Sequence, residues 1–477
     1  MQNMNLFLSN YKSMIKTISS KATVIFLWIL CCTVGCKNPS KKPPEIEIRT
    51  YAQNEITYPK KGFVVSEQTK EEFLKNFFLP WDIDGEVVLD SLDSFPGKKL
   101  SYLQQYLEDD EWYGENKKPH KKFLREAIVN NISNESFPNF LKKGIVVAHT
   151  NLRRIPSHKP GFDTYSKAGE GFPFDYFQET NLWANTPVQL IHLTNDKQWC
   201  YVLSPYYKGW VPMKDLGIVS EVFITNWKTG RYAMPLADYV QLEDPTSHYA
   251  LNARLGMVLP FDKGDDNEKV TVFYTNTNEN QEAKILKATV PNKQLAFNDF
   301  EFNGIHLKEL VSNLIGRPYG WGGNLENRDC SSMIRDMMAT YQIWLPRDSK
   351  DQIEIGQQYK LTGTIDEKIA RIKENGIPFR TILRKKGHNM LYVGNNENGE
   401  PLIFHAIWGL KTTYDNKELS KFLEQYPIEG IHQGEDGSIS GRHILGEAVI
   451  TSVLAGKDNH GITVPLMDEI YVMTTIL

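Results

Sequence analysis

Residues 317–333 read RPYGWGGNLENRDCSSM, a Gly-rich turn that leads into the triplet Asp329-Cys330-Ser331. The apolar residues that follow recur at a spacing near 3.6, at Met333, Ile334, Met337, Met338 and Tyr341. This spacing predicts an amphipathic helix that begins near Cys330 and ends before Leu345 and Pro346.

Cys330 has the setting of a nucleophile. At a helix N-terminus the unpaired backbone N–H groups and the helix dipole favour the thiolate, the form of cysteine that attacks carbonyls. The alternative is a buried structural thiol, since free cysteine is among the most buried residue types. The polar neighbours Asp329, Ser331 and Ser332 favour the reactive thiol, because structural thiols rarely have such surroundings.

Length and composition indicate a globular protein of about three domains. The chain has 477 residues, a formal net charge of −4 and 23% charged residues. No basic block stands out along the sequence, so we expect no nucleic-acid partner.

The first 35 residues resemble a bacterial lipoprotein signal peptide. Three lysines, Lys12, Lys16 and Lys21, precede the apolar run 22–30, which is shorter than the roughly 20 residues needed to span a bilayer. Cys36 is then the expected lipidation site, although Thr33 stands where such signals usually carry Leu. This predicts a protein anchored by lipid in the cell envelope.

Residues 36–56 are polar and Pro-containing, which is typical of a tether. Removal of residues 1–35 deletes three lysines and no acidic residue, so the net charge would move from −4 to −7. Only Cys36, Cys200 and Cys330 would remain, which is too few for a disulfide framework.

After the tether, the predicted secondary structure differs between successive segments of the chain. Charged helical stretches over 57–143 predict a helical N-terminal module, and short strands between turn residues over 144–220 predict a small β-barrel. A weaker pattern of the same kind covers 221–300. In 301–477 a helical face is followed by the Cys330 helix and then by strands, which predicts an α+β domain.

Two histidines can serve the cysteine. His388 and His405 lie in apolar runs joined by the polar link 395–400, which predicts a β-hairpin. A turn centred at 397–398 places Met390 opposite His405, so both histidines project from one face as diagonal neighbours. A zinc site is the other use of paired histidines, but no CxxC or HxxxH spacing accompanies them, and we expect neither a metal nor a cofactor.

The motifs PYGWGG, RDCSSMIRD, LPRDSKDQ, GHNMLYVG and FHAIWG strongly resemble those of NlpC/P60 cysteine peptidases. The chain is similar to the multidomain form of that family, in which an N-terminal stabilising module and two SH3-like β-barrels precede a papain-like α+β catalytic domain. The resemblance covers residues 57 to the end and is most specific in the catalytic domain. It implies a γ-D-glutamyl-L-diamino acid endopeptidase.

The resemblance also assigns roles to residues. Cys330 would be the nucleophile, His388 the general base, and His405 the residue that orients His388. Tyr319 would help the Cys330 backbone N–H stabilise the oxyanion. Asn389 departs from the pattern, because relatives more often place an apolar residue after the base, and this leaves the local strand packing open.

The substrate implied by the resemblance is a peptidoglycan stem peptide or its turnover fragment with a free N-terminal L-Ala. A buried ammonium needs an anion and hydrogen-bond acceptors. The positions that supply them in similar enzymes correspond here to Asp329, Ser331, Ser349, Glu179 and Tyr207. Each has a structural alternative; Asp329, for example, could be only a helix N-cap. We expect the chain to act as a monomer.

Two other functions remain open from the sequence. The same Cys/His pair could carry out amidase or acyl-transfer chemistry on another substrate, since fold does not fix function. The chain could also be a non-catalytic lipoprotein that binds the cell wall, although the intact set Cys330, His388 and His405 argues against this.

Overall fold

The computed structural model describes residues 48–83, 106–108, 112–132, 137–165, 169–262, 268–414, 432–433, 439–457 and 464–477. The predicted signal peptide and Cys36 lie outside these residues. Within the described part of the chain, no helix is both long and apolar enough to cross a membrane.

The N-terminal module is helical, as predicted, and one of its helices supports the rest of the protein. Its elements are η1 (Gln53–Glu55), β1 (Phe63–Val64), α2 (Glu67–Asp82) and α5 (Lys122–Asn130). Helix α2 is capped by the Ser66 hydroxyl and buries Phe73 and Phe77 in the same core as Met333 of the catalytic domain. Its Trp81 donates a hydrogen bond of 2.7 Å to the carbonyl of Gly144, at the first strand of the next domain.

The first SH3-like domain is a seven-stranded sheet with the order β4-β3-β7-β6-β5-β2-β8. Its elements are β2 (Lys142–Val146), β3 (Thr150–Arg153), β4 (Gln178–Leu182), β5 (Pro187–Leu193), β6 (Trp199–Leu203), β7 (Lys208–Pro212), η4 (Met213–Asp215) and β8 (Leu216–Ile218). Cys200 on β6 is fully buried among aliphatic side chains, as expected of a core strand position.

The second SH3-like domain combines a five-stranded sheet, β14-β13-β12-β9-β15, with the separate ribbon β10-β11. Its elements are α6 (Glu221–Trp227), β9 (Tyr232–Pro235), β10 (Val240–Glu243), β11 (Ala250–Ala253), β12 (Leu259–Asp262), β13 (Lys269–Thr277), β14 (Ala283–Pro291), η5 (Asn292–Gln294) and β15 (Leu295–Ala296). The strand pattern that was weak in the sequence thus forms a complete domain.

The catalytic domain packs helices against a seven-stranded antiparallel sheet of order β17-β23-β18-β19-β20-β22-β21. Its elements are β16 (Glu301–Phe302), α7 (Gly304–Leu314), η6 (Trp321–Glu326), α8 (Cys330–Ala339), η7 (Asp351–Glu354), β17 (Gln357–Lys360), α9 (Ile365–Asn375), β18 (Thr381–Lys385), β19 (His388–Asn395), β20 (Pro401–Tyr414), β21 (His432–Gln433), β22 (Ile439–Ser452), α11 (Leu466–Glu469) and β23 (Val472–Thr475). The prediction of a multidomain protein with an α+β catalytic domain is confirmed.

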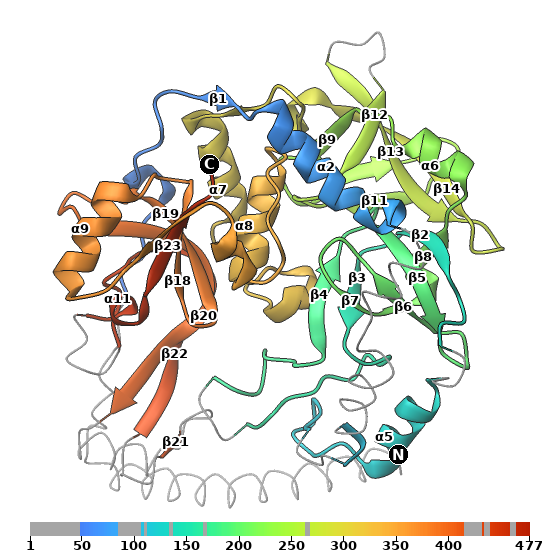
Figure 1. Cartoon of the computed structure of the whole chain (residues 1–477), viewed down its shortest axis with the longest axis horizontal. Helices are drawn as coiled ribbons and strands as arrows, with labels where there is room; N and C mark the ends of the chain where they lie inside the picture. The colour runs from blue at the N-terminus through green and yellow to red at the C-terminus, as the bar shows by residue number, and fades with distance from the viewer. Residues whose placement is uncertain are drawn as a thin grey trace, which may run out of the picture. The chain divides into compact units, whose positions relative to one another are not determined.

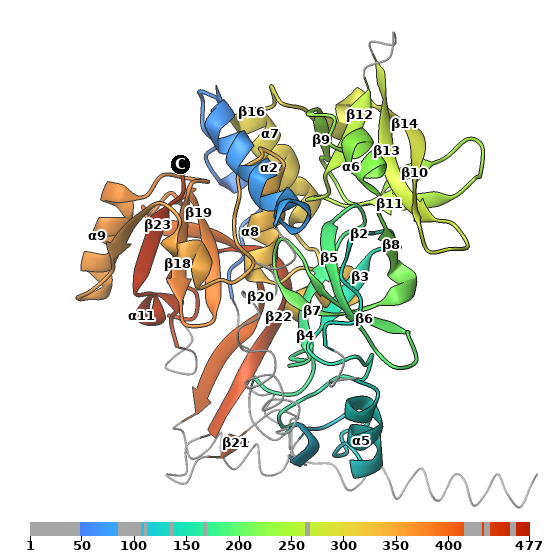
Figure 2. The ribbon, with the colours of Figure 1, turned by 45° about the vertical axis from the view of Figure 1, so that its right-hand side comes forward.

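Helix α8 lies between the catalytic sheet and strand β4 of the first SH3-like domain (Figures 1 and 2). The PYGWGG turn makes this close packing possible. Gly322 and Gly323 have φ of 60° and 78°, and a Cβ on Gly322 would lie 2.8 Å from the carbonyl oxygen of Gln178. Gln178 also donates a hydrogen bond of 3.0 Å to the Gly322 carbonyl. The glycines therefore serve to join two domains as well as to approach Cys330.

Candidate active site

Cys330 is the first residue of α8, and Asp329 is its N-cap. The Asp329 carboxylate accepts a hydrogen bond of 2.9 Å from the backbone N–H of Ser332, and the Ser332 hydroxyl accepts one of 3.0 Å from the N–H of Asp329. This reciprocal capping fixes the start of the helix. The Cys330 thiol is thereby held in a buried position, with only 6% of the residue exposed.

The unliganded structure does not favour the thiolate, and the sequence-based expectation on this point is wrong. Burial, followed by the neighbouring carboxylate of Asp329, raises the pKa of the Cys330 thiol to about 11. Backbone N–H groups of Asn389 and Ser331 act in the opposite direction, but they do not outweigh desolvation. The helix N-terminus is present, yet it also brings the acidic N-cap that opposes ionisation.

The two histidines are neighbours, as the hairpin predicts. Strands β19 and β20 pair Leu391 with Phe404, which is the register expected for a turn at 397–398. The Nε2 atom of His388 lies 2.8 Å from Nδ1 of His405. His405 is fully buried, and its Nε2 lies 3.1 Å from the hydroxyl of Thr451 on β22.

Both imidazoles are held neutral by their surroundings. Burial lowers the pKa of His405 to about 3 and places the pKa of His388 well below its usual value. For His388 the neighbouring His405 adds to this effect. A neutral His388 can accept a proton from Cys330, whose thiol is close to the backbone of the next residue, Asn389.

Asn389, where the sequence departs from the family pattern, ties the base to the loop after α8. Its side chain is fully buried and donates to the Ser349 carbonyl at 2.9 Å and to Oε1 of Gln352 at 3.0 Å. Gln352 in turn donates to the Ser331 carbonyl at 3.0 Å. An apolar residue at this position could not make these connections, so Asn389 supports the geometry of the site.

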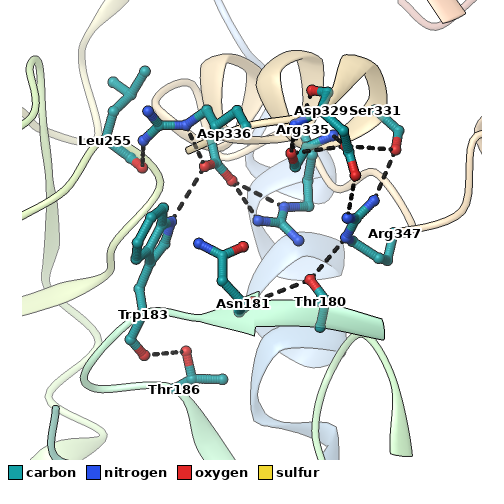
Figure 3. Close-up of polar contacts among 12 residues, drawn as sticks. Thr180, Asn181, Trp183, Thr186, Leu255, Asp329, Ser331, Arg335, Asp336 and Arg347 are labelled. Atoms are coloured by element: carbon teal, nitrogen blue, oxygen red, sulfur yellow. Dashed lines mark hydrogen bonds and ion pairs between the residues drawn. The ribbon is translucent and has the colours of Figure 1, made fainter. Parts of the chain in front are cut away.

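Arg347, which the sequence analysis did not single out, forms hydrogen bonds with the polar side chains on either side of the nucleophile (Figure 3). Its guanidinium donates to the carboxylate of Asp329 at 2.5 Å and to the hydroxyl of Ser331 at 2.8 Å. The same group donates to Oγ1 of Thr180 on β4 at 2.7 Å, which links the catalytic and SH3-like domains. In the sequence, this role could have been suspected only from the position of Arg347 in the LPRDS motif.

A second cluster of charge crosses the same domain boundary (Figure 3). Asp336 of α8 accepts hydrogen bonds from Arg328 at 2.8 Å, from Arg335 at 2.7 Å and from the indole of Trp183 at 3.2 Å. All of these side chains are buried. Removal of one of these side chains would leave buried charges without a partner, which is costly. The cluster therefore fixes the orientation of β4 relative to α8.

Glu179 and Tyr207 of the first SH3-like domain reach the catalytic domain. The Tyr207 hydroxyl donates a hydrogen bond to the carboxylate of Asp348, another residue that the sequence analysis missed. Burial, opposed by Arg154 but reinforced by the charge of Asp348, raises the pKa of Glu179. Two carboxylates from different domains therefore lie close together, and neither forms an ion pair within the described residues.

Tyr319 is fixed by its backbone, which donates a hydrogen bond of 2.8 Å to the Gly446 carbonyl on β22. Burial raises the pKa of its hydroxyl, and the nearby Cys330 adds to the rise. The phenol is therefore a hydrogen-bond donor at neutral pH, beside the thiol. Among the described residues, no group of three His, Cys, Asp or Glu is arranged to hold a metal ion.

Comparison with known domains matches four segments of the chain. Residues 23–137 match the N-terminal NLPC_P60 stabilising domain, and residues 316–402 match the NlpC/P60 family. Between them, residues 160–212 match an SH3 domain of SH3b1 type and residues 220–266 match one of SH3b2 type. The comparison with curated proteins finds no match.

Among solved structures, an NlpC/P60 endopeptidase from Photobacterium damselae subsp. piscicida is similar over 91% of this chain and 98% of its own. The two are 26% identical, with a TM-score of 0.73. An NlpC/P60 family protein from Bacillus cereus is 14% identical over 70% of this chain and all of its own, with a TM-score of 0.45. The chain therefore combines an NlpC/P60 domain with the N-terminal stabilising domain and two SH3 domains of similar proteins, and it is a cysteine peptidase.

Proposed function

We propose that this peptidase hydrolyses the γ-D-glutamyl-L-diamino acid bond of peptidoglycan-derived peptides that carry a free N-terminal L-Ala. The match of residues 316–402 to the NlpC/P60 family supports a cell-wall peptidase. The observation that carries the finer proposal is the pair of carboxylates, Glu179 and Asp348, which act on each other across the domain boundary and, within the described residues, form no ion pair.

The proposed chemistry assigns the nucleophile to Cys330 and the base to His388. As the thiol attacks the γ-carbonyl, its proton passes to His388, and the Cys330 N–H and Tyr319 stabilise the oxyanion. The C–N bond then breaks, His388 gives the proton to the leaving amine, and a thioester remains. Water, deprotonated by His388, attacks this thioester and releases the γ-D-Glu product and the thiol.

An ammonium suits the space between Glu179 and Asp348. Two nearby carboxylates repel each other, and this repulsion contributes to the raised pKa of Glu179. The ammonium group of a substrate would offset that repulsion. Its own loss of hydration would be compensated, because it would lie next to two carboxylates. A substrate acylated on its N-terminus would bring no charge and would leave the repulsion between the two carboxylates in place.

The structure changes which residues we assign to this pocket. Asp329 and Ser331 already bind Arg347, so we propose that they hold Arg347 beside the substrate and do not contact the amine themselves. Asp348 takes their place as the second anion. Ser349 remains a candidate substrate contact because it is partly exposed and its carbonyl is anchored by Asn389.

The proposal is tested with purified protein and two tripeptides, L-Ala-γ-D-Glu-L-Lys and its N-acetyl derivative. We expect cleavage of the first with release of lysine, and a kcat/KM at least ~100-fold lower for the second, since one buried ion pair is lost. Cys330→Ala should abolish both. Equal cleavage of the two peptides would contradict the amine pocket, and release of muramic acid from a muramoyl peptide would indicate an amidase instead.

We further propose that the protein is lipid-anchored through Cys36 in the cell envelope, where its substrate is found. The support is the sequence of residues 1–36 alone. Metabolic labelling with a fatty acid should modify the wild-type chain and not Cys36→Ser. Labelling of both proteins, or of neither, would contradict the anchor while leaving the peptidase assignment intact.

A further inference from the structure

Arg442 on β22 is a cation near the active site that the proposed mechanism does not use. Its guanidinium donates one hydrogen bond of 3.2 Å, to the Gly409 carbonyl on β20, and the residue remains exposed to solvent. The loop of the first SH3-like domain packs directly on it. A Cβ on Gly169, which has φ of +87°, would lie 2.5 Å from Nε of Arg442.

Within the described part of the chain, Arg442 forms no ion pair. Its surroundings lower its pKa, chiefly by desolvation, and Glu170 and Glu469 offset this only in part. One of these acids, Glu170, accepts a hydrogen bond of 2.9 Å from the Tyr176 hydroxyl. A guanidinium held against a glycine, with four donor N–H groups that have no partner among the described residues, is arranged to receive an anion from solution.

The charge of Arg442 acts on two of the catalytic groups. It influences the pKa of both Tyr319 and His388, whereas Glu179 is influenced by Arg154, Arg347 and Arg153. Arg347 and Arg442 both lower the pKa of Tyr319, against the larger effect of burial. From Tyr319, the ring of Trp408 and the carbonyl of the next residue, Gly409, lead to Arg442, so a peptide whose scissile carbonyl lies at Cys330 can reach Arg442 over this surface.

The surface between Tyr319 and Arg442 is aromatic. Trp408, one residue before Gly409, lies 6.2 Å from Tyr319 between ring centroids and 6.0 Å from Phe172. Phe172 is 58% exposed although it is a large apolar side chain. Such a surface suits the aliphatic part of a diamino acid side chain, with a charged group at the end of the path.

We propose that Arg442 binds a carboxylate of the diamino acid that leaves on cleavage. This inference rests on the proposed function. It gives the leaving group a site of its own and explains why a loop of the first SH3-like domain reaches the β20–β22 hairpin (Figure 1). A carboxylate bound there would also offset the Arg442 charge that acts on His388, which makes His388 a stronger base as substrate arrives.

The experiment compares three substrates that share L-Ala-γ-D-Glu: L-Lys with a free α-carboxylate, the same peptide with an α-carboxamide, and meso-diaminopimelate. Arg442→Gln should lower kcat/KM for the free acid by about 10–100-fold, the range for one charge-assisted hydrogen-bonded pair. It should change kcat/KM for the carboxamide by less than about twofold. A loss on diaminopimelate that exceeds the loss on lysine would place the distal carboxylate on Arg442.

Two further variants separate binding from folding. Lys411→Gln removes the exposed cation paired opposite Arg442 in the hairpin, and it should leave the ratio of acid to carboxamide unchanged. Gly169→Ala keeps the arginine but displaces its guanidinium, so it should lower the same ratio as Arg442→Gln. Thermal unfolding of each variant identifies any that fails to fold. The ratio of kcat/KM for the acid to kcat/KM for the carboxamide does not depend on the fraction of active protein.

Several outcomes would overturn the proposal. An equal loss on acid and carboxamide would show that Arg442 only supports the hairpin. A loss that disappears when γ-D-Glu is replaced by D-isoglutamine would assign Arg442 to the α-carboxylate of the glutamyl residue. If the wild-type protein cleaves none of the three peptides, the proposed function itself fails, and this result is distinct from both of the others.

Discussion

His405 stands 3.1 Å from Thr451, measured from Nε2 to Oγ1, so the proposed base belongs to a chain of three hydrogen-bonding side chains. If Nε2 of His405 donates to the hydroxyl, its Nδ1 is free to accept from Nε2 of His388, 2.8 Å away. The Nδ1 atom of His388 is then an acceptor, as a base must be. Thr451 therefore extends the predicted pair of histidines by one residue.

Thr451→Val should lower kcat by about tenfold with little change in KM, because one hydrogen bond that positions the base is lost. Steady-state kinetics on the tripeptide measure both constants. The matched control is Thr474→Val on β23, whose hydroxyl donates to the Ile355 carbonyl at 2.8 Å and does not contact either histidine. An equal fall in kcat for both variants would show that Thr451 acts only through stability.

The reactivity of Cys330 should rise steeply with pH in the free protein. Because burial raises the pKa of this thiol to about 11, alkylation by iodoacetamide should accelerate roughly tenfold per pH unit between pH 7 and 10, following the thiolate fraction. Mass spectrometry locates the label, and Cys330→Ala provides the blank. Cys200 should stay unlabelled, since it is fully buried and burial raises its pKa to about 12.

A rate that does not change between pH 6 and 9 would contradict this prediction. It would mean that Cys330 and His388 already exist as a thiolate and an imidazolium before substrate binds. That state would require the two groups to compensate each other's burial by more than desolvation costs.

Local patterns in the sequence were sufficient for much of the catalytic domain. The periodicity after Cys330 marks α8, and the polar link 395–400 sets the register that brings His388 and His405 together. These features depend on residues that are near in sequence, where periodicity and turn chemistry act directly. Thr451 could not be found in this way, because it lies on β22, and the polar signal of one threonine is common.

The amine pocket depends on contacts that no local pattern encodes. Tyr207 and Asp348 are 141 residues apart and meet because the first SH3-like domain packs on the catalytic domain. Likewise, the sequence identifies Gly322 and Gly323 as a turn. Their close contact with β4 becomes visible only when the structure places Gln178 beside them. The ionisation of Cys330 was misjudged because burial, which dominates it, is not visible in a sequence.

Substrate affinity should fall at acid pH through Glu179. Its pKa is raised by burial and by Asp348, so the carboxylate gains its proton at a higher pH than an exposed glutamate and then loses its attraction for the amine. KM for L-Ala-γ-D-Glu-L-Lys should therefore increase as pH falls through this raised pKa. Glu179→Gln should have a KM about 10–100-fold higher and nearly independent of pH over that interval.

The control for this prediction is Glu221→Gln, which removes an exposed glutamate of the second SH3-like domain paired with Lys143. It should leave KM and its pH dependence unchanged. If Glu179→Gln retains the acid rise in KM, the titrating group lies elsewhere, and Asp348→Asn becomes the variant to examine.

Acid stability should depend on His192, a fully buried histidine on β5 of the first SH3-like domain. Within the described residues, neither of its ring nitrogens has a hydrogen-bond partner, and it packs between Phe137 and Trp210. Burial lowers its pKa to about 4 from the ordinary value of 6.5. Because the folded pKa is depressed, this histidine costs no stability above pH 6.5, and the cost grows as pH falls toward 4.

The cost amounts to about 2 kcal/mol at pH 5 by linkage, and to about 3 kcal/mol once the pH is well below 4. His192→Phe removes the titration and keeps an aromatic ring in the core, so its free energy of unfolding should fall about 2 kcal/mol less than that of the wild type between pH 7.5 and 5. Urea denaturation at the two pH values measures this difference. His388 and His405 titrate in the same direction in both proteins and cancel from it. The control is His248→Phe, at a ring that is 78% exposed, and its free energy of unfolding should fall with pH as that of the wild type does. If the stability of His192→Phe falls as much as that of the wild type, water already reaches the buried ring.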